Sequence, residues 1–468
     1  MASGEKEETN IVRIDGRTLE GGGQLVRNAL ALSALTSIPV TIDHIRGNRK
    51  GKTGLKGSHT AAVKFLAEIC GGQVLGARVG SSQITFYPQG RLNEPCIKPE
   101  YTIQQSTPGS IFLVFQALYP YLLYAGARTH AHWPIRLNVT GGTNVSFSPS
   151  YDYIAQVLVP NLEKLGLPHL SVNLNRRGWG TGPLDLGSVT FEISPLTCGP
   201  TKDATNSHGP KLDRSIPKFP SFSIRRHRRG TITRIEVTIL APEIPLPIDD
   251  ILSDSDPNTA RRRSRTTGTY TVRSFLQAET CRGLADALAS LPSHLFSNSD
   301  NRIPVKIHIS EATGHPTRLY VLLVAHTSTG FRLGRDALLD GRADSEDRQH
   351  RSSHSNSSKD SMRSRIQRMI DRCITDFMEE LQPAEGPGDE DSTSGPDIRG
   401  ISKEKSCVDV FMRDQLVIFE ALGKLQNTRD ESGTLTGIDE EIEEDEHSWS
   451  MHTRTAMWVC EQFLGAKV

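Results

Sequence analysis

Residues 14–36 read IDGRTLEGGGQLVRNALALSALT, and this stretch sets the interpretation of the rest of the chain. A short strand at 11–16 leads into a glycine-rich turn, and an apolar helix is predicted from Gln24 to about Thr36. Glycines at a strand-to-helix turn let backbone N–H groups approach a phosphate, and the helix N-terminus favours an anion. Taken alone, a tight turn with a solvated Glu20 is the simpler interpretation.

Similar helices recur along the chain. We predict them at 58–70, with Ser58 as N-cap, at 151–165 and at 452–464, each followed by glycine. Pairs of strands are expected after the first two, near 73–79 and 83–87, and near 170–174 and 188–193. The pattern predicts a repeated α+β unit.

A second α/β unit interrupts the first. Strands are predicted at 231–240, 304–310 and 319–325, and helices at 273–291 and 363–381. We therefore predict a repeat domain formed by 11–196 plus 401–468, and an insert domain formed by 197–400. Stretches near 253–268, 341–362 and 383–400 are rich in Ser, Gly, Asp and Arg, so we expect disordered loops there.

The charges balance overall but are clustered. Lys+Arg and Asp+Glu both number 54 among the 468 residues. Basic residues gather at 46–56, 225–229 and 261–265, and acidic residues at 439–446. Clustering of this kind is compatible with nucleic-acid binding by a protein of zero net charge. The basic runs at 225–229 and 261–265 are compatible with nuclear import signals or with solvated loops.

Cysteine usage and the N-terminus bear on the compartment. The seven cysteines form no CxxC pair and no zinc-site spacing, and an odd, scattered set is typical of a reducing environment. The N-terminus has no apolar signal core, and no run of 18 apolar residues occurs. We expect a soluble intracellular protein without a membrane span.

The basic loop at 46–56 reads RGNRKGKTGLK. It is not a P-loop, because three residues separate Gly47 from Gly51 where that motif needs four. Its five cationic side chains are suited to contacting several phosphates, with salt-dependent affinity. A solvated basic loop is an equally good interpretation.

Two further motifs place polar groups or backbone near a ligand. Gln116 lies in an apolar helix after Thr107-Pro-Gly-Ser110, and its amide either reads a nucleobase or bonds to backbone if it is buried. Gly141-Gly142 follows a strand at 135–139 and leads to Pro149. Such a turn lets backbone approach a ligand, although a simple turn explains it as well.

Two helix starts carry the remaining candidates. Asp414 and Gln415 fall in the first turn of an apolar helix, where the helix dipole alone explains an acidic residue. His452 starts the last helix, where the positive form of imidazole is disfavoured. A neutral imidazole is what a histidine nucleophile requires, but an exposed histidine near a helix cap is the simpler interpretation.

The order of these motifs resembles that of the RNA 3′-terminal phosphate cyclase family. The motifs, spanning residues 11 to 464, are IDGRTLEGGGQLVRNALALSALT, IRGNRKGKTGLKGSHTAAVKFLAEICGG, TPGSIFLVFQALYP, GGTNVSFSP, TSTGFRLG, VDVFMRDQL and MHTRTAMWVCEQFL. The resemblance implies an α+β (α/β) fold. Its large domain has three repeated βαβαββ-type units resembling a translation-initiation-factor C-terminal domain, with a smaller thioredoxin-like α/β domain inserted.

The resemblance also implies an activity. The expected enzyme is a ligase forming a phosphoric ester bond, which uses ATP and Mg²⁺ or Mn²⁺ to convert an RNA 3′-phosphate end into a 2′,3′-cyclic phosphate. The implied route passes through a covalent AMP–histidine and an RNA-(3′)pp(5′)-A intermediate. The partner is RNA with a 3′-phosphate end, no obligate protein partner is expected, and the implied location is the nucleus (nucleoplasm), with the cytoplasm as a second location.

The family's functional positions can be assigned to residues of this chain by matching the motifs. His452 matches the nucleophile and Glu20 the position linked to the divalent metal. Basic positions suited to RNA phosphate are matched by Arg27, Arg46 and Arg49. Positions lining the nucleotide pocket are matched by Gln116, Pro149, Phe411, Asp414 and Gln415. Where Phe411 stands, the family commonly has Tyr, so stacking on adenine is kept and a hydroxyl contact is lost.

The chain departs from the family at several places. A Pro-Lys-Gly-Gly-Gly stretch is replaced by GWGTGPLDLG at 178–187, Thr53 stands for a Pro, and Ser58 for a Gln. The sequence ends four residues after Leu464, where relatives usually continue into a strand, so the last repeat is expected to lack an edge.

Three other functions compete with the cyclase reaction. A cyclase-like branch of the family has this fold, lacks the nucleophilic His and works in ribosome assembly without catalysis. A general RNA-binding module would use the basic loop and leave Gln116 and His452 unexplained. An enolpyruvyl-type transferase has a related fold but needs no His nucleophile. The presence of His452 favours the catalytic branch.

Overall fold

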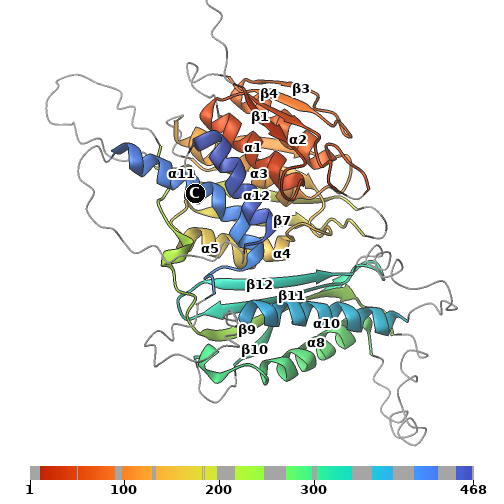
Figure 1. The fold of residues 1–468 in the computed structure, drawn as a ribbon. Helices are drawn as coiled ribbons and strands as arrows, with labels where there is room; N and C mark the ends of the chain where they lie inside the picture. Colours follow the sequence, from red (N-terminus) through yellow and green to blue (C-terminus); the bar gives the residue numbers. More distant parts are fainter. Residues whose placement is uncertain are drawn as a thin grey trace, which may run out of the picture.

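Two consecutive segments of the chain build the same kind of four-stranded sheet (Figure 1). The computed structural model describes residues 11–49, 51–89, 97–128, 133–181, 183, 185–197, 217–246, 270–297, 303–339, 361–382, 405–430 and 449–465. The first segment comprises β1 (Val12–Asp15), α1 (Gly23–Thr36), β2 (Val40–Asp43), α2 (Gly57–Cys70), β3 (Gln73–Leu75) and β4 (Ile84–Tyr87). Its strand order is β1-β2-β4-β3, with β1 and β2 parallel and the other pairs antiparallel.

The second segment repeats this arrangement. It comprises β5 (Glu100–Gln104), α3 (Ile111–Arg128), β6 (Ile135–Gly141), α4 (Tyr151–Tyr153), a π-helical turn (Ile154–Leu158), α5 (Val159–Lys164), β7 (Leu170–Arg176) and β8 (Gly187–Ile193). Its order is β5-β6-β8-β7, again with the first pair parallel and the others antiparallel. The repeated unit is therefore confirmed for these two segments.

Two C-terminal helices complete the layer of helices beside α1. Helices α11 (Val410–Asp430) and α12 (Met451–Leu464) pack on each other, and α12 packs on α1 (Figure 1). Their apolar residues join the same core as α1, α2 and α3. No strand accompanies α11 or α12 among the residues that the structure describes, so the sheet of a third unit lies outside them or is absent.

The inserted unit has its own sheet. Its strands and main helices are β9 (Ile232–Pro242), α8 (Val272–Leu288), β10 (Val305–Thr313), β11 (Tyr320–Thr327), β12 (Arg332–Leu338) and α10 (Met362–Leu381). Short 3₁₀ turns occur at Ile224–Arg226 and Ser293–Leu295. The order is β10-β9-β11-β12, and α8 and α10 cover the face that looks away from α4 and α5 (Figure 1). The mixed α/β class is therefore confirmed.

Strand β11 explains why this sheet is covered on both faces. All eight of its residues are buried. Val321, Leu323 and Ala325 pack in the core beneath α8 and α10. Leu322 and Val324 point the other way, into the core of the repeats. Alternate residues of a strand face opposite sides, so this apolar run joins the two units through a shared hydrophobic layer.

A proline explains a second junction between the units. Pro160 has no N–H, so it cannot donate to the carbonyl of Gln156 four residues earlier. Arg332 of β12 supplies the missing donor, with its Nη1 2.9 Å from that carbonyl oxygen. The Gln156 side chain also bonds Thr238 of β9, 3.0 Å away. The π-helical turn at this place is thus held by side chains of the inserted sheet.

Some boundaries differ from the sequence-based predictions. Helix α2 begins at Gly57 with Lys56 as N-cap residue, so the prediction of Ser58 as the cap was wrong. Strands β5 and β12 were not predicted, and β3 ends at Leu75 rather than 79. The basic run at 261–265, the acidic run at 439–446, the loops near 253–268 and 383–400 and most of that near 341–362 lie outside the described residues.

Candidate active site

The turn between β1 and α1 packs closely around its own glycines. A side chain added at Gly22 would overlap the carboxylate of Glu20, and one at Gly23 would overlap Arg27 and His59. Gly22 is the N-cap residue of α1, so the first free N–H groups of the helix point out of this turn. The glycines therefore let charged side chains and the helix N-terminus converge at one place.

Glu20 joins three segments that are far apart in the sequence. Its side chain is 8% exposed, and its Oε2 lies 3.3 Å from Nδ1 of His452. Its Oε1 pairs with Arg49 of the basic loop. Its backbone N–H donates to Oγ1 of Thr455 on α12 at 3.2 Å. The glycine-rich turn, the basic loop and the start of α12 thus meet at one carboxylate.

His452 is half-exposed, and its surroundings favour the neutral form of the imidazole. Helix α12 is capped by Ser450, whose Oγ accepts from the N–H of Thr453 at 3.0 Å. Burial lowers the pKa of His452 below the ordinary histidine value, and the positive charges of Arg49 and Arg27 lower it further, while Asp414 opposes them. When the Nδ1 proton faces Glu20, Nε2 keeps the lone pair that a nucleophile needs.

Arg27 lies in a buried polar layer beneath this imidazole. Its Nε donates to Oε1 of Gln116 on α3 at 2.7 Å, and burial lowers the pKa of Arg27 to about 10. The amide oxygen of Gln116 thus accepts from a buried guanidinium rather than from the backbone N–H groups, and a nucleobase contact of this side chain stays a prediction. Arg27 and Gln116 are therefore brought together as predicted site residues, but as partners of each other.

Asp414 carries an unusual carboxyl group. Its Oδ1 is buried without a hydrogen-bond partner among the described residues. Burial raises the pKa of Asp414 to about 7, and the charges of His452 and Arg27 limit the rise. The backbone carbonyl of Asp414 accepts from Nε2 of Gln24 at 3.2 Å. An unpartnered buried oxygen is available to a ligand.

His59 is a site residue that the sequence interpretation missed. It is 2% exposed, and its Nδ1 accepts from the N–H of Lys56 at 3.3 Å. Burial lowers its pKa well below the ordinary value, and Arg27, Arg46 and Lys56 add to that effect. Its position directly after the basic loop was visible in the sequence, but its contact with Gly23 of α1 was not.

The two loop arginines have different surroundings. Arg49 is 44% exposed and faces Glu20. Arg46 turns back on its own loop, with Nη1 donating to the carbonyls of Lys52 and Gly54 at 2.9 and 3.3 Å. Arg46 also has φ +58°, and burial lowers its pKa. Arg46 therefore supports the shape of the loop, and Arg49 presents charge beside His452.

The ring of Phe411 is contacted by an arginine of the inserted unit. The Arg335 guanidinium of β12 lies 4.5 Å from the centroid of the Phe411 ring, and Tyr153 meets the ring edge-on at 6.2 Å. Phe411 is still 45% exposed. Next to it, the amide of Gln415 donates to the backbone carbonyl of Phe411 at 2.9 Å. An arginine therefore stacks on the aromatic ring predicted to contact adenine.

Asp409 fixes the start of α11. Its Oδ1 accepts from the hydroxyl of Tyr153 at 2.7 Å and from the N–H groups of Phe411 and Met412, both at 3.0 Å. Its Oδ2 accepts from the N–H of Gly334 on β12 at 2.8 Å. Pro149 lies just before Ser150, whose Oγ accepts from the N–H of Tyr153 at 3.0 Å. Two predicted nucleotide-pocket residues, Pro149 and Phe411, are thus linked through Tyr153.

Metal binding at this site depends on Glu20. No cluster of three or more His, Cys, Asp or Glu able to hold a metal occurs in the described ranges. Glu20 is nevertheless a carboxylate beside the nucleophile candidate. Mg²⁺ commonly binds proteins through one or two carboxylates together with substrate phosphates and water. Glu20 fits that mode of binding and does not fit an all-protein cage.

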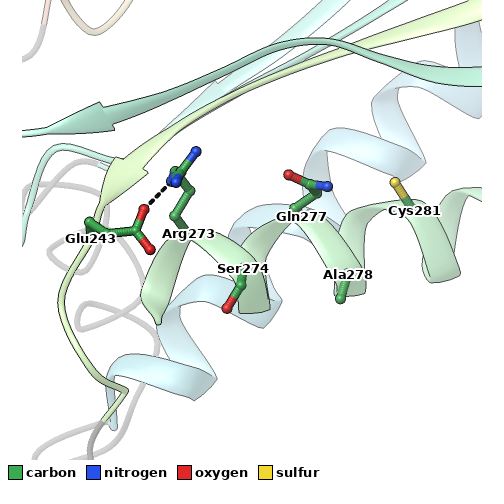
Figure 2. A pocket seen from close by; sticks show the side chains of 6 residues that line it. All are labelled: Glu243, Arg273, Ser274, Gln277, Ala278 and Cys281. Carbon is green, nitrogen blue, oxygen red and sulfur yellow. Dashed lines mark hydrogen bonds and ion pairs between the residues drawn. The ribbon is translucent and has the colours of Figure 1, made fainter. Parts of the chain in front are cut away.

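A separate cavity of about 310 Å³ lies on the inserted unit. It is lined by Glu243, Arg273, Ser274, Gln277, Ala278 and Cys281, and Arg273 pairs with Glu243 (Figure 2). Helix α8 carries most of these residues, on the side of the inserted sheet away from α12 (Figure 1). None of them belongs to the cluster around His452. Across the described part of the chain, no helix is both long and apolar enough to cross a membrane.

Comparison with known proteins identifies the family of the chain. The family model described as RNA 3′-terminal phosphate cyclase matches residues 18–468. A protein named RNA 3′-terminal phosphate cyclase from Koribacter versatilis is 39% identical over 188 residues, which cover 40% of this chain and 48% of that protein. Proteins of the same name from Drosophila melanogaster and Desulfurococcus amylolyticus are 36% and 41% identical over 187 and 169 residues.

These pairwise matches are partial. They cover 40% and 36% of this chain, and 48% and 44% of the Drosophila and Desulfurococcus proteins respectively. The chain thus aligns with about half the length of the curated relatives that it matches. The family model, by contrast, runs through both the repeats and the inserted unit.

Proposed function

Because the chain belongs to the RNA 3′-terminal phosphate cyclase family, we propose that it converts an RNA 3′-phosphate end into a 2′,3′-cyclic phosphate with ATP. The observation that carries the proposal is the pairing of His452 with Glu20 beside Arg49 and Arg27. A histidine of lowered pKa, oriented at Nδ1 and surrounded by cations, is suited to attack on a phosphate.

In the first step Nε2 of His452 attacks the α-phosphorus of ATP. A P–N bond forms, the bond to the β-phosphate oxygen breaks, and pyrophosphate leaves. With the imidazole proton on Nδ1, which lies 3.3 Å from Oε2 of Glu20, the lone pair of Nε2 would be free to attack. Arg49 and the N-terminus of α1 offset the charge that develops on the phosphate oxygens.

Two displacements complete the reaction. An oxygen of the RNA 3′-phosphate attacks the phosphorus of the AMP–His452 adduct, giving RNA-(3′)pp(5′)-A and free imidazole. The neighbouring ribose 2′-hydroxyl then attacks the 3′-phosphorus, closes the ring and expels AMP. Splitting one dehydration into three displacements lowers each barrier. Asp414, whose pKa of about 7 lets it exchange a proton near neutrality, would take up the proton of the 2′-hydroxyl.

The nucleotide would be held by residues around α11. Phe411 offers a half-exposed ring for adenine, and Pro149 lies on the linked loop. Asp414 offers its unpartnered oxygen. Because α11 begins at Val410, Asp414 and Gln415 lie in its second turn, not in the first turn as predicted from the sequence. Gln116 would act indirectly, by holding Arg27.

Glu20, together with the ATP phosphates, would hold Mg²⁺ or Mn²⁺. When bound, the ion neutralises phosphate charge and favours departure of pyrophosphate. Arg49 occupies one Glu20 oxygen in the present structure, so metal binding would compete with that ion pair. We place the reaction in the nucleus, as the sequence resemblance implies, and fractionation of cells that express the protein would test this.

The alternative is the ribosome-assembly branch of the family, which acts without catalysis. The deciding experiment is incubation with Mg²⁺ and ATP labelled at the α-phosphate, comparing the wild type with His452→Ala. The exposed His169 provides a matched control, His169→Ala, because it pairs with Glu163 away from the cluster. We expect acid-labile label on the wild type and the control, and none on His452→Ala.

A second test uses a substrate for which the first step of the reaction is not needed. RNA that already carries the (3′)pp(5′)-A end should be cyclised by His452→Ala, because the missing nucleophile acts only before that intermediate. Absence of label on folded wild-type protein at several divalent ions would overturn the cyclase proposal and favour the non-catalytic branch.

A further inference from the structure

Phe147 is exposed and held in a strained backbone conformation. Its side chain is 98% exposed, the most among the large hydrophobic residues of the described chain. Its φ is +59°, in the left-handed region that a bulky residue rarely adopts. The other non-glycine residues with positive φ in the described chain are Leu19 in the glycine-rich turn, His44 just before the basic loop, Arg46 within it, and Ser37 at the end of α1. Backbone strain of this kind gathers at functional sites.

The loop that carries Phe147 is fixed at both ends. The N–H groups of Thr143 and Asn144 donate to the carbonyl of Gly178 at 2.8 and 3.0 Å. The N–H of Tyr151 donates to the carbonyl of Thr143 at 3.0 Å. Within the loop, Oγ of Ser148 donates to the carbonyl of Val145 at 2.9 Å. The ring is therefore presented by an ordered turn, at low entropic cost for binding.

The loop is connected through contacts to the elements that we propose bind phosphate. It follows the carboxyl end of β6, as the basic loop follows that of β2. The N–H of Gly142 donates to the carbonyl of Gly109 at 2.8 Å. The loop at 107–110 in turn packs beside Gly57 and Ser58, at the end of the basic loop. A continuous row of contacts thus links the Phe147 loop to the basic loop.

We propose that Phe147 is a stacking platform for a nucleobase of the bound RNA, upstream of its reacting 3′-phosphate. The inference rests on the proposed function. Proteins bind single-stranded RNA by combining a cationic track with aromatic rings on which bases stack. Arg49 and Lys52 of the basic loop supply the cations, and Phe147 supplies a ring exposed to solvent.

The exposure of Phe147 favours RNA over the adenine of ATP. Phe411 already provides a half-exposed ring at the predicted nucleotide pocket, with Arg335 stacked on it. Phe147 is almost wholly exposed, so it lies on the surface rather than in the wall of a pocket. A strand that crosses this surface can stack a base there, whatever the sequence of the strand.

The test compares Phe147→Gly and Phe147→Trp with the wild type for affinity to a short RNA with a 3′-phosphate. Glycine accepts the positive φ and removes the ring without strain, whereas tryptophan keeps a stacking surface. The matched control is Trp133→Gly, because Trp133 is also exposed (51%) but precedes the opposite end of β6. We expect Phe147→Gly to weaken binding roughly tenfold, and Phe147→Trp and the control to bind normally.

A scan of RNAs with one abasic nucleotide identifies the contact. At one position upstream of the 3′ end, the abasic RNA should bind the wild type about tenfold more weakly, while Phe147→Gly shows no further loss. Normal RNA affinity of Phe147→Gly would overturn the inference. A raised KM of Phe147→Gly for ATP, measured in self-adenylylation without RNA, would also overturn the inference, because the ring would then contact adenine.

The two proposals fail separately. If the wild type binds RNA through Phe147 but never becomes labelled by ATP, the cyclase proposal fails and the RNA platform stands. If the wild type is labelled and cyclises RNA while Phe147→Gly behaves as the wild type, the platform alone is rejected.

Discussion

Nδ1 of His452 lies 3.3 Å from Oε2 of Glu20, although the two residues are 432 positions apart in the sequence. The contact joins the first turn of the last helix to the glycine-rich turn near the N-terminus. It places the imidazole of the proposed nucleophile beside the one carboxylate that the family resemblance links to metal. Glu20 could therefore act by orienting the imidazole or by binding the metal ion, and these two roles predict different behaviour for a variant of Glu20.

Glu20→Gln should slow self-adenylylation by about two orders of magnitude, because the imidazole loses its orienting carboxylate. The measurement is the rate of AMP transfer at rising Mg²⁺ concentration. If Glu20 acts by orientation, saturating Mg²⁺ does not restore the rate. Full recovery at high Mg²⁺ would contradict orientation and show that metal binding is its main role.

Asp414→Asn should lower the pKa of His452 further. The ionised form of Asp414 opposes the effect of burial, and the variant removes that charge. Because the pKa of Asp414 is itself about 7, this effect is confined to the pH range in which its carboxyl is ionised. The measurement is an NMR titration of the His452 ring, with the exposed Asp286→Asn as control. Since the neutral imidazole is the nucleophile, the acid limb of the self-adenylylation profile should shift to lower pH in the variant. An unchanged titration would show that the two groups are not coupled.

Gln116→Leu should destabilise the protein, because the buried Arg27 loses a hydrogen-bond acceptor. Breaking a hydrogen bond to a charged group costs about 1.5–3 kcal/mol in the free energy of unfolding. Urea denaturation measures the change, and Gln116→Glu, which keeps an acceptor, should recover most of it. An unaltered midpoint in Gln116→Leu would mean that Arg27 finds another partner.

Arg335→Lys should raise the KM for ATP in self-adenylylation several-fold with little change in kcat. Lysine keeps the charge between Glu380 and Asp409 but lacks the planar group that stacks on Phe411. Arg335→Met should instead destabilise the fold by about 3–5 kcal/mol, because buried carboxylates lose their partner. An unchanged KM in a folded Arg335→Lys would show that the stack does not position Phe411.

Asp336→Asn should change the pH dependence of stability. Burial raises the pKa of Asp336 to about 6, and Tyr320 donates to its Oδ2 at 2.9 Å. A carboxyl with a raised folded-state pKa binds its proton more tightly in the native state, so its contribution to stability is lost as pH rises from about 4 to above 6. The wild type should lose about 2 kcal/mol more than the variant between pH 4 and pH 8. Parallel pH profiles in chemical denaturation would contradict this.

Local sequence pattern predicted the regular elements well and the polar partnerships poorly. The helices 362–381 and 451–464 were predicted within two residues, because apolar periodicity and caps are local signals. Strand β12 was missed, since RLGRDAL does not alternate regularly. Its place as an edge strand is set by pairing with β11.

The sequence by itself determined the α/β class, the glycine-rich turn, the basic loop and the resemblance to the cyclases, because these depend on local propensity and on the order of motifs. The tertiary structure decided which polar groups meet: Glu20 with His452, Arg27 with Gln116, and Arg46 with its own loop. It also decided the burial of His59 and the exposure of Phe147. The physical reason is that pKa values and hydrogen-bond partners depend on solvent exclusion and on contacts between distant segments, and these exist only after packing.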